Sequence, residues 1–142
     1  GYEPTPLVSL PALARARPTT LLEDATVPRS KVPDMVEAIA KVAATHQVRI
    51  ATFGHAGDGN LHLYICQDGL KDAVWTDVVE RVMERLYAQA RELGGEVSGE
   101  HGIGHAKRAY LLESAGARQI DLMRGIKAVF DPNGILNPGK VV

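Results

Sequence analysis

Residues 48–66 read VRIATFGHAGDGNLHLYIC, and this stretch decides the fold that the sequence predicts. Residues 48–53 have the β-branched and aromatic composition of a strand. A glycine-rich turn follows over residues 54–60. Leu61, Leu63 and Ile65 then alternate with His62, Tyr64 and Cys66, which predicts a strand with one buried face. We therefore expect two antiparallel strands with the turn between them.

Helical periodicity flanks this strand pair on both sides. Apolar residues spaced by three and four predict one helix from Pro33 to about His46 and a second over residues 74–90, which glycines end. Short strands are expected at residues 24–27 and 96–98. The order strand, helix, strand, strand, helix, strand predicts an α+β fold, with a ferredoxin-like antiparallel sheet and helices on one face.

The chain divides into three predicted segments. Residues 1–20 carry four prolines and little periodicity, so we expect a tail or linker. Residues 21–103 form the ferredoxin-like unit. Residues 104–142 contain two further helical stretches, near 106–112 and 120–130, and a turn that begins at Asp131.

Composition limits the class of protein. The chain has 142 residues, 45% of them hydrophobic and 23% charged, which is typical of a soluble globular domain. A formal net charge of −1 gives no reason to expect nucleic acid as a partner. Cys66 is the single cysteine, so no internal disulfide can form. With no signal peptide or membrane span in the sequence, we expect a cytoplasmic protein, leaving open membrane association through another subunit.

Two glycine-rich clusters carry the chemistry. The first spans residues 55–62 and the second residues 98–104, and both lie at predicted strand ends. Two imidazoles and one carboxylate form a common open site for a divalent metal, so His55, His62 and Glu100 are candidate ligands. Such a site suits an anionic, chelating 2-hydroxy acid, whose hydroxyl pKa the metal would lower. His101 is the candidate base, because imidazole titrates near neutral pH.

Other residues of these types have simpler explanations. Asp58 precedes a glycine and fits ordinary turn chemistry. His46 suits the C-terminal end of a helix, where the dipole favours a positive charge. His105 is expected at a helix start, and Cys66 is expected to be a small buried thiol, although it shares strand parity with His62.

Three segments resemble motifs of the FAD-linked oxidases. Residues 53–62, FGHAGDGNLH, resemble the family motif G-H-x-G-D-G-N-L-H. Residues 98–104, SGEHGIG, and residues 131–140, DPNGILNPGK, are similar to its S-G-E-H-G-I-G and D-P-x-x-I-L-N-P-G-K motifs. The family includes the flavin subunit of glycolate oxidase, D-lactate dehydrogenase and D-2-hydroxyglutarate dehydrogenase. The resemblance covers about residues 11–142.

The resemblance implies a partial flavoenzyme. FAD would be bound mainly by a domain that these residues do not include, and residues 104–142 would pack on it. Carried over by motif, His55, His62 and Glu100 would hold zinc or manganese, with His101 as the base that helps oxidise a 2-hydroxy acid to the 2-oxo acid. Asn137 would lie beside the flavin.

This sequence also departs from the family pattern. Tyr64 occupies a substrate-contacting position where some members have asparagine. Residues 5–10 contain no arginine, although the family often has one there to hold the substrate carboxylate. The identity of the 2-hydroxy acid therefore stays open.

Two other functions remain compatible with these residues. One is a stand-alone metal-dependent hydrolase that uses metal-bound water and His101. The other is a non-catalytic metal-binding subunit that supports a separate flavin protein. The partners expected under the first interpretation are a small 2-hydroxy acid and a flavin-binding domain or subunit, with a homo-oligomer also expected because residues 104–142 carry an apolar face.

Overall fold

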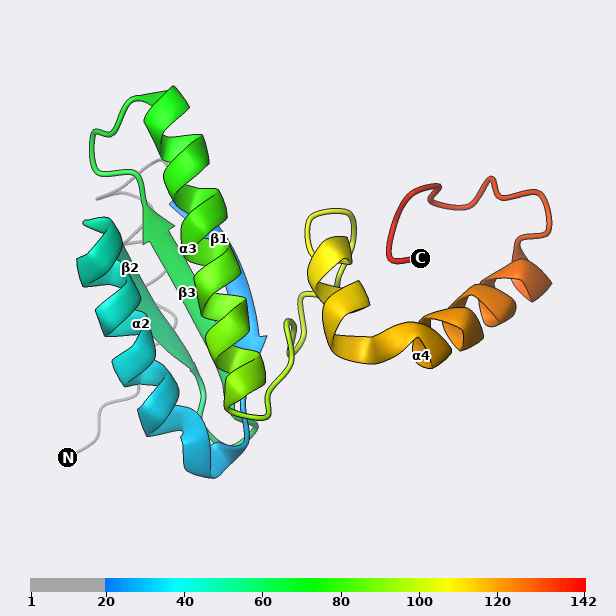
Figure 1. Ribbon diagram of the computed structural model, residues 1–142, viewed down its shortest axis with the longest axis horizontal. Helices are drawn as coiled ribbons and strands as arrows, with labels where there is room; N and C mark the ends of the chain where they lie inside the picture. The colour runs from blue at the N-terminus through cyan, green and yellow to red at the C-terminus, as the bar shows by residue number, and fades with distance from the viewer. Residues whose placement is uncertain (1–19) are drawn as a thin grey trace.

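The computed structural model describes residues 20–142 and shows an α+β fold, as the sequence predicts (Figure 1). The helices α2 and α3 lie side by side on one face of a three-stranded sheet, and α4 extends away from it. The elements in chain order are β1 (Thr20–Thr26), the 3-10 helix η1 (Arg29–Lys31), α2 (Val32–His46), β2 (Arg49–His55), β3 (Asn60–Cys66), α3 (Asp72–Glu92) and α4 (Arg108–Phe130).

The central strand is β3, which pairs antiparallel with β1 on one side and β2 on the other. Leu63 at its centre lies opposite Glu23 and Thr52 and is fully buried. The alternating apolar residues of β3 face the two helices, as expected from the period of two. The core therefore lies between the sheet and the helices, and it includes Met35, Ile39, Leu61, Leu63, Ile65, Val82, Leu86 and Tyr87.

The predicted fourth strand is reduced to a single bridge, between Thr26 and Glu96. Its position beside β1 is that of the last strand in a ferredoxin-like sheet. The chain leaves the sheet edge because side chains take its backbone groups: the ammonium of Lys107 donates to the carbonyl of Val97, and the carboxylate of Asp24 accepts the N–H groups of residues 99–101. These bonds replace the strand ladder that the sequence pattern predicted.

The first strand is longer than predicted. It begins at Thr20 rather than residue 24, because all seven of its residues pair with β3. Thr20 therefore belongs to the sheet, and the rest of the expected tail, residues 1–19, lies outside the described residues. The two predicted helices are confirmed as α2 and α3, each within about two residues of its expected bounds.

The C-terminal arm consists of α4 and the loop after it. The two predicted helical stretches are joined as one element with a break at Gly116, whose φ of 76° and ψ of 159° are not helical. The loop returns to the start of the arm, where the N–H of Val141 donates to the carbonyl of Gly104 at 2.8 Å. Within residues 20–142, no helix is long and apolar enough to cross a membrane.

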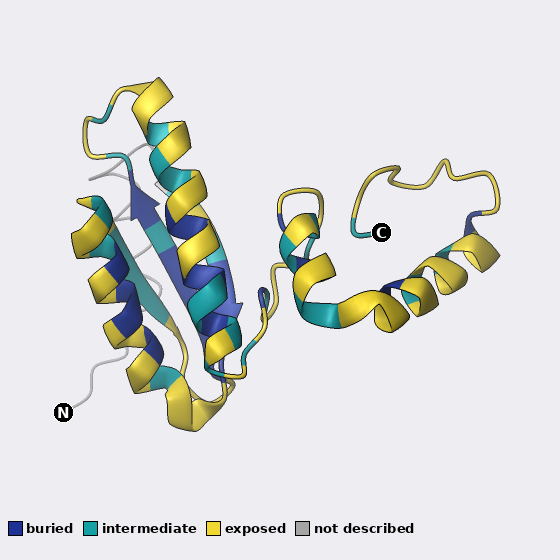
Figure 2. Ribbon diagram, viewed as in Figure 1, coloured by how far each residue is buried: buried dark blue, intermediate teal, exposed yellow. Residues whose placement is uncertain are grey.

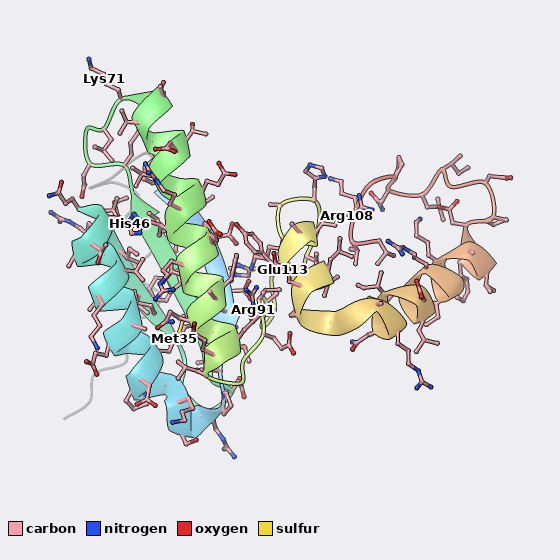
Figure 3. The ribbon with its side chains drawn as sticks, in the orientation of Figure 1. Met35, His46, Lys71, Arg91, Arg108 and Glu113 are labelled. Carbon is pink, nitrogen blue, oxygen red and sulfur yellow. The ribbon has the colours of Figure 1, made fainter. Side chains whose placement is uncertain are left out.

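The first turns of α4 contact α3. The Arg91 guanidinium lies 2.9 Å from the Glu113 carboxylate (Figure 3), and the rings of Tyr87 and Tyr110 lie 4.7 Å apart. Beyond the break, the arm is largely exposed (Figure 2). Its exposed large apolar residues are Leu122, Ile126, Val129, Phe130, Ile135 and Leu136. The division into three domains remains a prediction.

Candidate metal centre

The candidate ligands come from three separate segments that meet on the sheet face opposite α2 and α3. His55 ends β2, His62 lies in β3, and Glu100 lies in the loop between α3 and α4. His62 points away from the helices because its neighbours Leu61 and Leu63 face the core. A side chain at Gly54 would meet the carbonyl of Asn60 at 2.1 Å, so glycine there permits the close approach of the two strands.

The three ligand groups are close enough to share one cation. One ligand atom from each of His55, His62 and Glu100 lies within 4.8 Å of the others. The Glu100 carboxylate oxygen Oε1 is 2.9 Å from Nε2 of His62 and 3.8 Å from Nε2 of His55. Two imidazole nitrogens and one carboxylate oxygen within this distance of one another fit a divalent metal such as zinc or manganese.

His62 is the buried member of this cluster, with a side chain only 10% exposed. Burial lowers the pKa of His62, and the neighbouring His101 and His55 lower it further, whereas the Glu100 carboxylate opposes the shift. The ring is therefore neutral at pH 7, which is the form that binds a metal. The rings of His62 and His101 are stacked with centroids 5.0 Å apart.

His101 lies between two carboxylates. Its Nδ1 is 3.6 Å from Oδ1 of Asp24, and its Nε2 is 4.0 Å from Oε1 of Glu100. One ring nitrogen thus faces the protein interior, and the other faces the candidate ligands. This orientation suits a base whose outer nitrogen accepts a proton while a buried carboxylate favours a proton on the inner one.

Asp24 is a site residue whose structural role the sequence did not reveal. It is fully buried in β1, directly opposite His62. Burial by itself would raise the pKa of Asp24, but hydrogen bonds from the Glu100 N–H, the Lys107 ammonium and the His101 N–H outweigh burial and hold the pKa well below its usual value. No clear signal in the sequence pointed to this role, because β1 also contains Glu23 and a threonine at each end.

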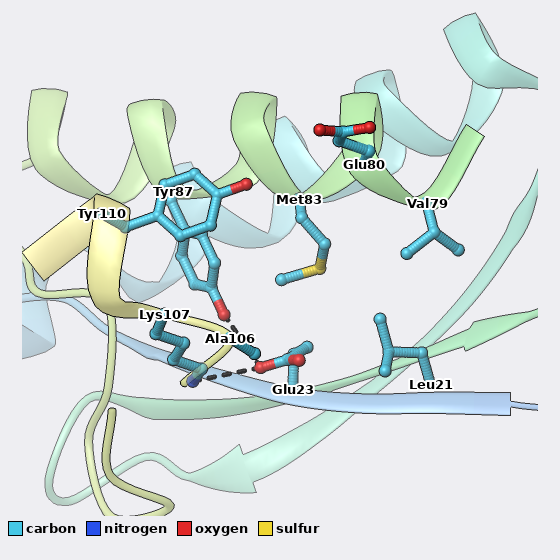
Figure 4. A pocket seen from close by; sticks show the side chains of 9 residues that line it. All are labelled: Leu21, Glu23, Val79, Glu80, Met83, Tyr87, Ala106, Lys107 and Tyr110. Carbon is cyan, nitrogen blue, oxygen red and sulfur yellow. Dashed lines mark hydrogen bonds and ion pairs between the residues drawn. The ribbon is translucent and has the colours of Figure 1, made fainter. Parts of the chain in front are cut away.

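Lys107 is the second residue that the sequence reasoning missed. It is buried, and its Nζ donates to the carboxylate and the carbonyl of Asp24 and lies 3.2 Å from Oε2 of Glu23. Figure 4 shows Lys107 and Glu23 with Tyr87, whose hydroxyl donates to Glu23 at 2.9 Å. Burial raises the pKa of Tyr87, and Glu23 adds to the shift, so the hydroxyl keeps its proton.

A cavity of about 210 Å³ opens beside the candidate ligands. Its lining residues are Leu22, Phe53, His62, Tyr64, Glu100 and His101. Tyr64, predicted to touch the substrate, therefore lies at the same cavity as the candidate base. A second cavity of about 180 Å³ lies on the helix side of β1, next to Glu23 and Lys107 (Figure 4).

Asn137 is not brought to this cluster. It lies in the exposed loop after α4, where its backbone adopts a left-handed φ of 47°. Asp131 shapes that loop by accepting the N–H groups of Ile135 and Leu136, and a hydrogen bond from Lys127 lowers the pKa of Asp131.

The cavities of about 210 and 180 Å³ are too small for FAD, because typical pockets for far smaller ligands reach 300–1,000 Å³. Neither of these two cavities by itself fits FAD.

Comparison with known proteins supplies the family. The model of "FAD linked oxidases, C-terminal domain" matches residues 7–141. The chain is 49% identical over 133 residues to "Glycolate oxidase subunit GlcD" of Bacillus subtilis (strain 168), covering 94% of this chain and 28% of that protein. It is 46% identical over 125 residues to "D-lactate dehydrogenase" of Anaerostipes hadrus, covering 87% of this chain and 26% of that protein.

A third relative is named for a different hydroxy acid. The chain is 38% identical over 126 residues to "D-2-hydroxyglutarate dehydrogenase" of Stutzerimonas stutzeri (strain A1501), covering 87% of this chain and 27% of that protein. The chain thus spans only about a quarter of the length of these relatives. The match over nearly all of its residues nevertheless shows that this chain belongs to the family of FAD-linked oxidase C-terminal domains.

Proposed function

We propose that this chain is the metal- and substrate-binding part of a flavin-dependent 2-hydroxy-acid dehydrogenase of the D-lactate or glycolate type. The observation that carries the proposal is the convergence of His55, His62 and Glu100 beside a cavity that also contains His101. The names of the relatives support a hydroxy acid as substrate. Membership in a flavin-linked family favours this function over a stand-alone hydrolase.

Each residue has a distinct task in this proposal. His55, His62 and Glu100 would hold a divalent metal, which would supply Lewis-acid chemistry that lowers the pKa of the substrate hydroxyl. His101 removes the hydroxyl proton at Nε2, the ring nitrogen that faces Glu100. Leu22, Phe53 and Tyr64 form the apolar and aromatic wall against which a short substrate side chain packs.

The first prediction concerns the metal. We expect the chain to bind about one equivalent of Zn²⁺ or Mn²⁺, because two imidazoles and a carboxylate each place a ligand atom within 4.8 Å of the others. His55→Ala should weaken binding by more than the roughly 10–100-fold typical of residues that only orient ligands. Titration against a metal-sensitive dye measures this loss. His46→Ala, at the C-terminal end of α2 (Figure 3) and not among the three candidate ligands, is the matched control and should bind like the wild type. Equal, negligible binding by the wild type and His55→Ala would contradict the proposed site.

The second prediction concerns the exposed arm, which we propose packs against the flavin-binding part. Ile126, Val129 and Phe130 are 63%, 77% and 78% exposed, which is unusual for large apolar residues so close together. Without its partner we expect the isolated chain to self-associate or to bind a hydrophobic dye. Light scattering over a micromolar dilution series should show a particle larger than 15.3 kDa.

The double variant Ile126→Glu/Val129→Glu should restore the monomer, because it charges the apolar face. Val36→Glu, at a single exposed apolar residue of α2, is the control and should leave association unchanged. A monomeric wild-type chain that binds no dye would show that this face needs no partner.

A further inference from the structure

Asp24 organises the loop that carries the candidate ligand Glu100 and the candidate base His101. Its Oδ2 accepts the backbone N–H groups of Gly99 at 2.7 Å, Glu100 at 2.8 Å and His101 at 3.1 Å. Three successive N–H groups that converge on one anion form a nest, a geometry that proteins use to bind phosphates and other anions. Here the anion in the nest is a side chain of the same protein.

Further contacts hold the loop to the sheet. The Ser98 hydroxyl donates to the Asp24 carboxylate and accepts the N–H of Gly102 at 2.9 Å. A side chain at Gly99 would meet the side-chain oxygens of Asn60 and Thr26, each at 2.4 Å. The loop therefore packs closely against the ends of β1 and β3. Its conformation is restricted both by this packing at Gly99 and by the hydrogen bonds to Asp24.

Lys107 makes a buried carboxylate at this position possible. An unpaired buried charge is strongly unfavourable, and the Lys107 ammonium supplies the positive charge. The same ammonium donates to the carbonyl groups of Asp24 and Val97, each at 3.0 Å. Lys107 thus ties β1, the strand-like segment before the loop, and the start of α4 into one unit.

From these contacts we infer that Asp24, neutralised by Lys107, is the positioning residue of the metal site. The inference rests on the proposed function, because it assumes that Glu100 binds a metal. Asp24 touches neither metal nor substrate. It sets the backbone of Glu100 and His101, and the Glu100 carboxylate lies 2.9 Å from His62. A ligand held in place in advance loses less conformational freedom on binding.

The test compares metal affinity in Asp24→Asn and the wild type. Asparagine has nearly the same shape but carries no charge, so its oxygen accepts the three N–H groups more weakly. With that oxygen in the nest, its NH₂ group would face the Lys107 ammonium, which also needs an acceptor. We expect Zn²⁺ affinity to fall about 10–100-fold, as for other residues that orient ligands. Asp131→Asn is the matched control, because Asp131 also accepts backbone N–H groups and a lysine hydrogen bond, but in the C-terminal loop. It should bind Zn²⁺ like the wild type.

A second readout does not depend on metal. Amide hydrogen exchange measured by NMR should show protected N–H groups at Gly99, Glu100 and His101 in the metal-free wild type. This protection should be lost in Asp24→Asn and kept in Asp131→Asn. If Asp24→Asn does not fold, Ser98→Ala replaces it, since it removes only the hydroxyl and should lower Zn²⁺ affinity by about threefold.

The outcomes separate the two proposals. Unchanged Zn²⁺ affinity and unchanged exchange in Asp24→Asn, while His55→Ala loses metal, would overturn the positioning role and leave the metal site intact. No metal binding by the wild type would overturn the metal site, and with it the positioning role. If Asp24→Asn loses exchange protection and binds Zn²⁺ more weakly, while Asp131→Asn does neither, the metal site and the positioning role of Asp24 are both supported.

Discussion

The isolated chain is expected to show no oxidation of D-lactate, glycolate or D-2-hydroxyglutarate. Oxidation of a hydroxy acid removes two electrons, and neither a zinc ion nor any protein side chain accepts a hydride. The described cavities are too small to enclose FAD. The purified chain should therefore be colourless, and dye-coupled assays should give only the background rate. A yellow preparation with turnover would contradict this division of labour.

Addition of a flavin-binding partner should restore turnover if the proposed function is correct. In the reconstituted enzyme, His101→Ala should lower kcat by about 10²–10⁴-fold, the usual contribution of a general base. Its metal content should stay unchanged, because His101 is not among the three candidate ligands. Loss of metal in this variant would mean that His101 supports the metal rather than proton transfer. His46→Ala serves as the control that should change neither.

Lys107→Met is expected to lower the free energy of unfolding by about 3–5 kcal/mol, the usual cost of breaking a buried ion pair. Methionine fills similar space, so the loss reports the charge and its hydrogen bonds. Lys107 is 4% exposed, and without it the carboxylates of Asp24 and Glu23 would remain together in the interior. Urea unfolding followed by circular dichroism measures the change.

Lys127→Met is the control for this experiment. Lys127 also pairs with a buried aspartate, Asp131, but its own side chain is 30% exposed and can be replaced by water. We expect a clearly smaller loss than for Lys107→Met, because water screens and can replace a partly exposed interaction. Equal effects of the two substitutions would show that Lys107 contributes no more than a surface ion pair.

The local patterns of the sequence predicted most of the sheet and helices correctly. The helical stripe in residues 74–90 reports a single buried face, which is a local property of an amphipathic element. Alternation in residues 61–66 located a strand correctly, but its second face, which carries His62 and Cys66, is also buried, because that face lies under other parts of the chain. The final strand was predicted too long because its backbone groups bond to Lys107 and Asp24, which are distant in the chain from one another. A local sequence pattern cannot show that these two side chains compete with a neighbouring strand for the same backbone groups.

The same distinction holds for the candidate site. The sequence predicted that His55 and His62 could meet, because they lie at the two ends of a glycine-rich turn and antiparallel strands place such residues side by side. The motifs likewise determined the family. Only the tertiary structure showed that Asp24, which pairs with His62 across neighbouring strands, anchors the loop of Glu100 and His101. The hydrogen bonds from Asp24 to that loop join residues more than 70 positions apart. A buried carboxylate is stable only where donors such as these surround it, and the packing of helices, loop and sheet brings them together.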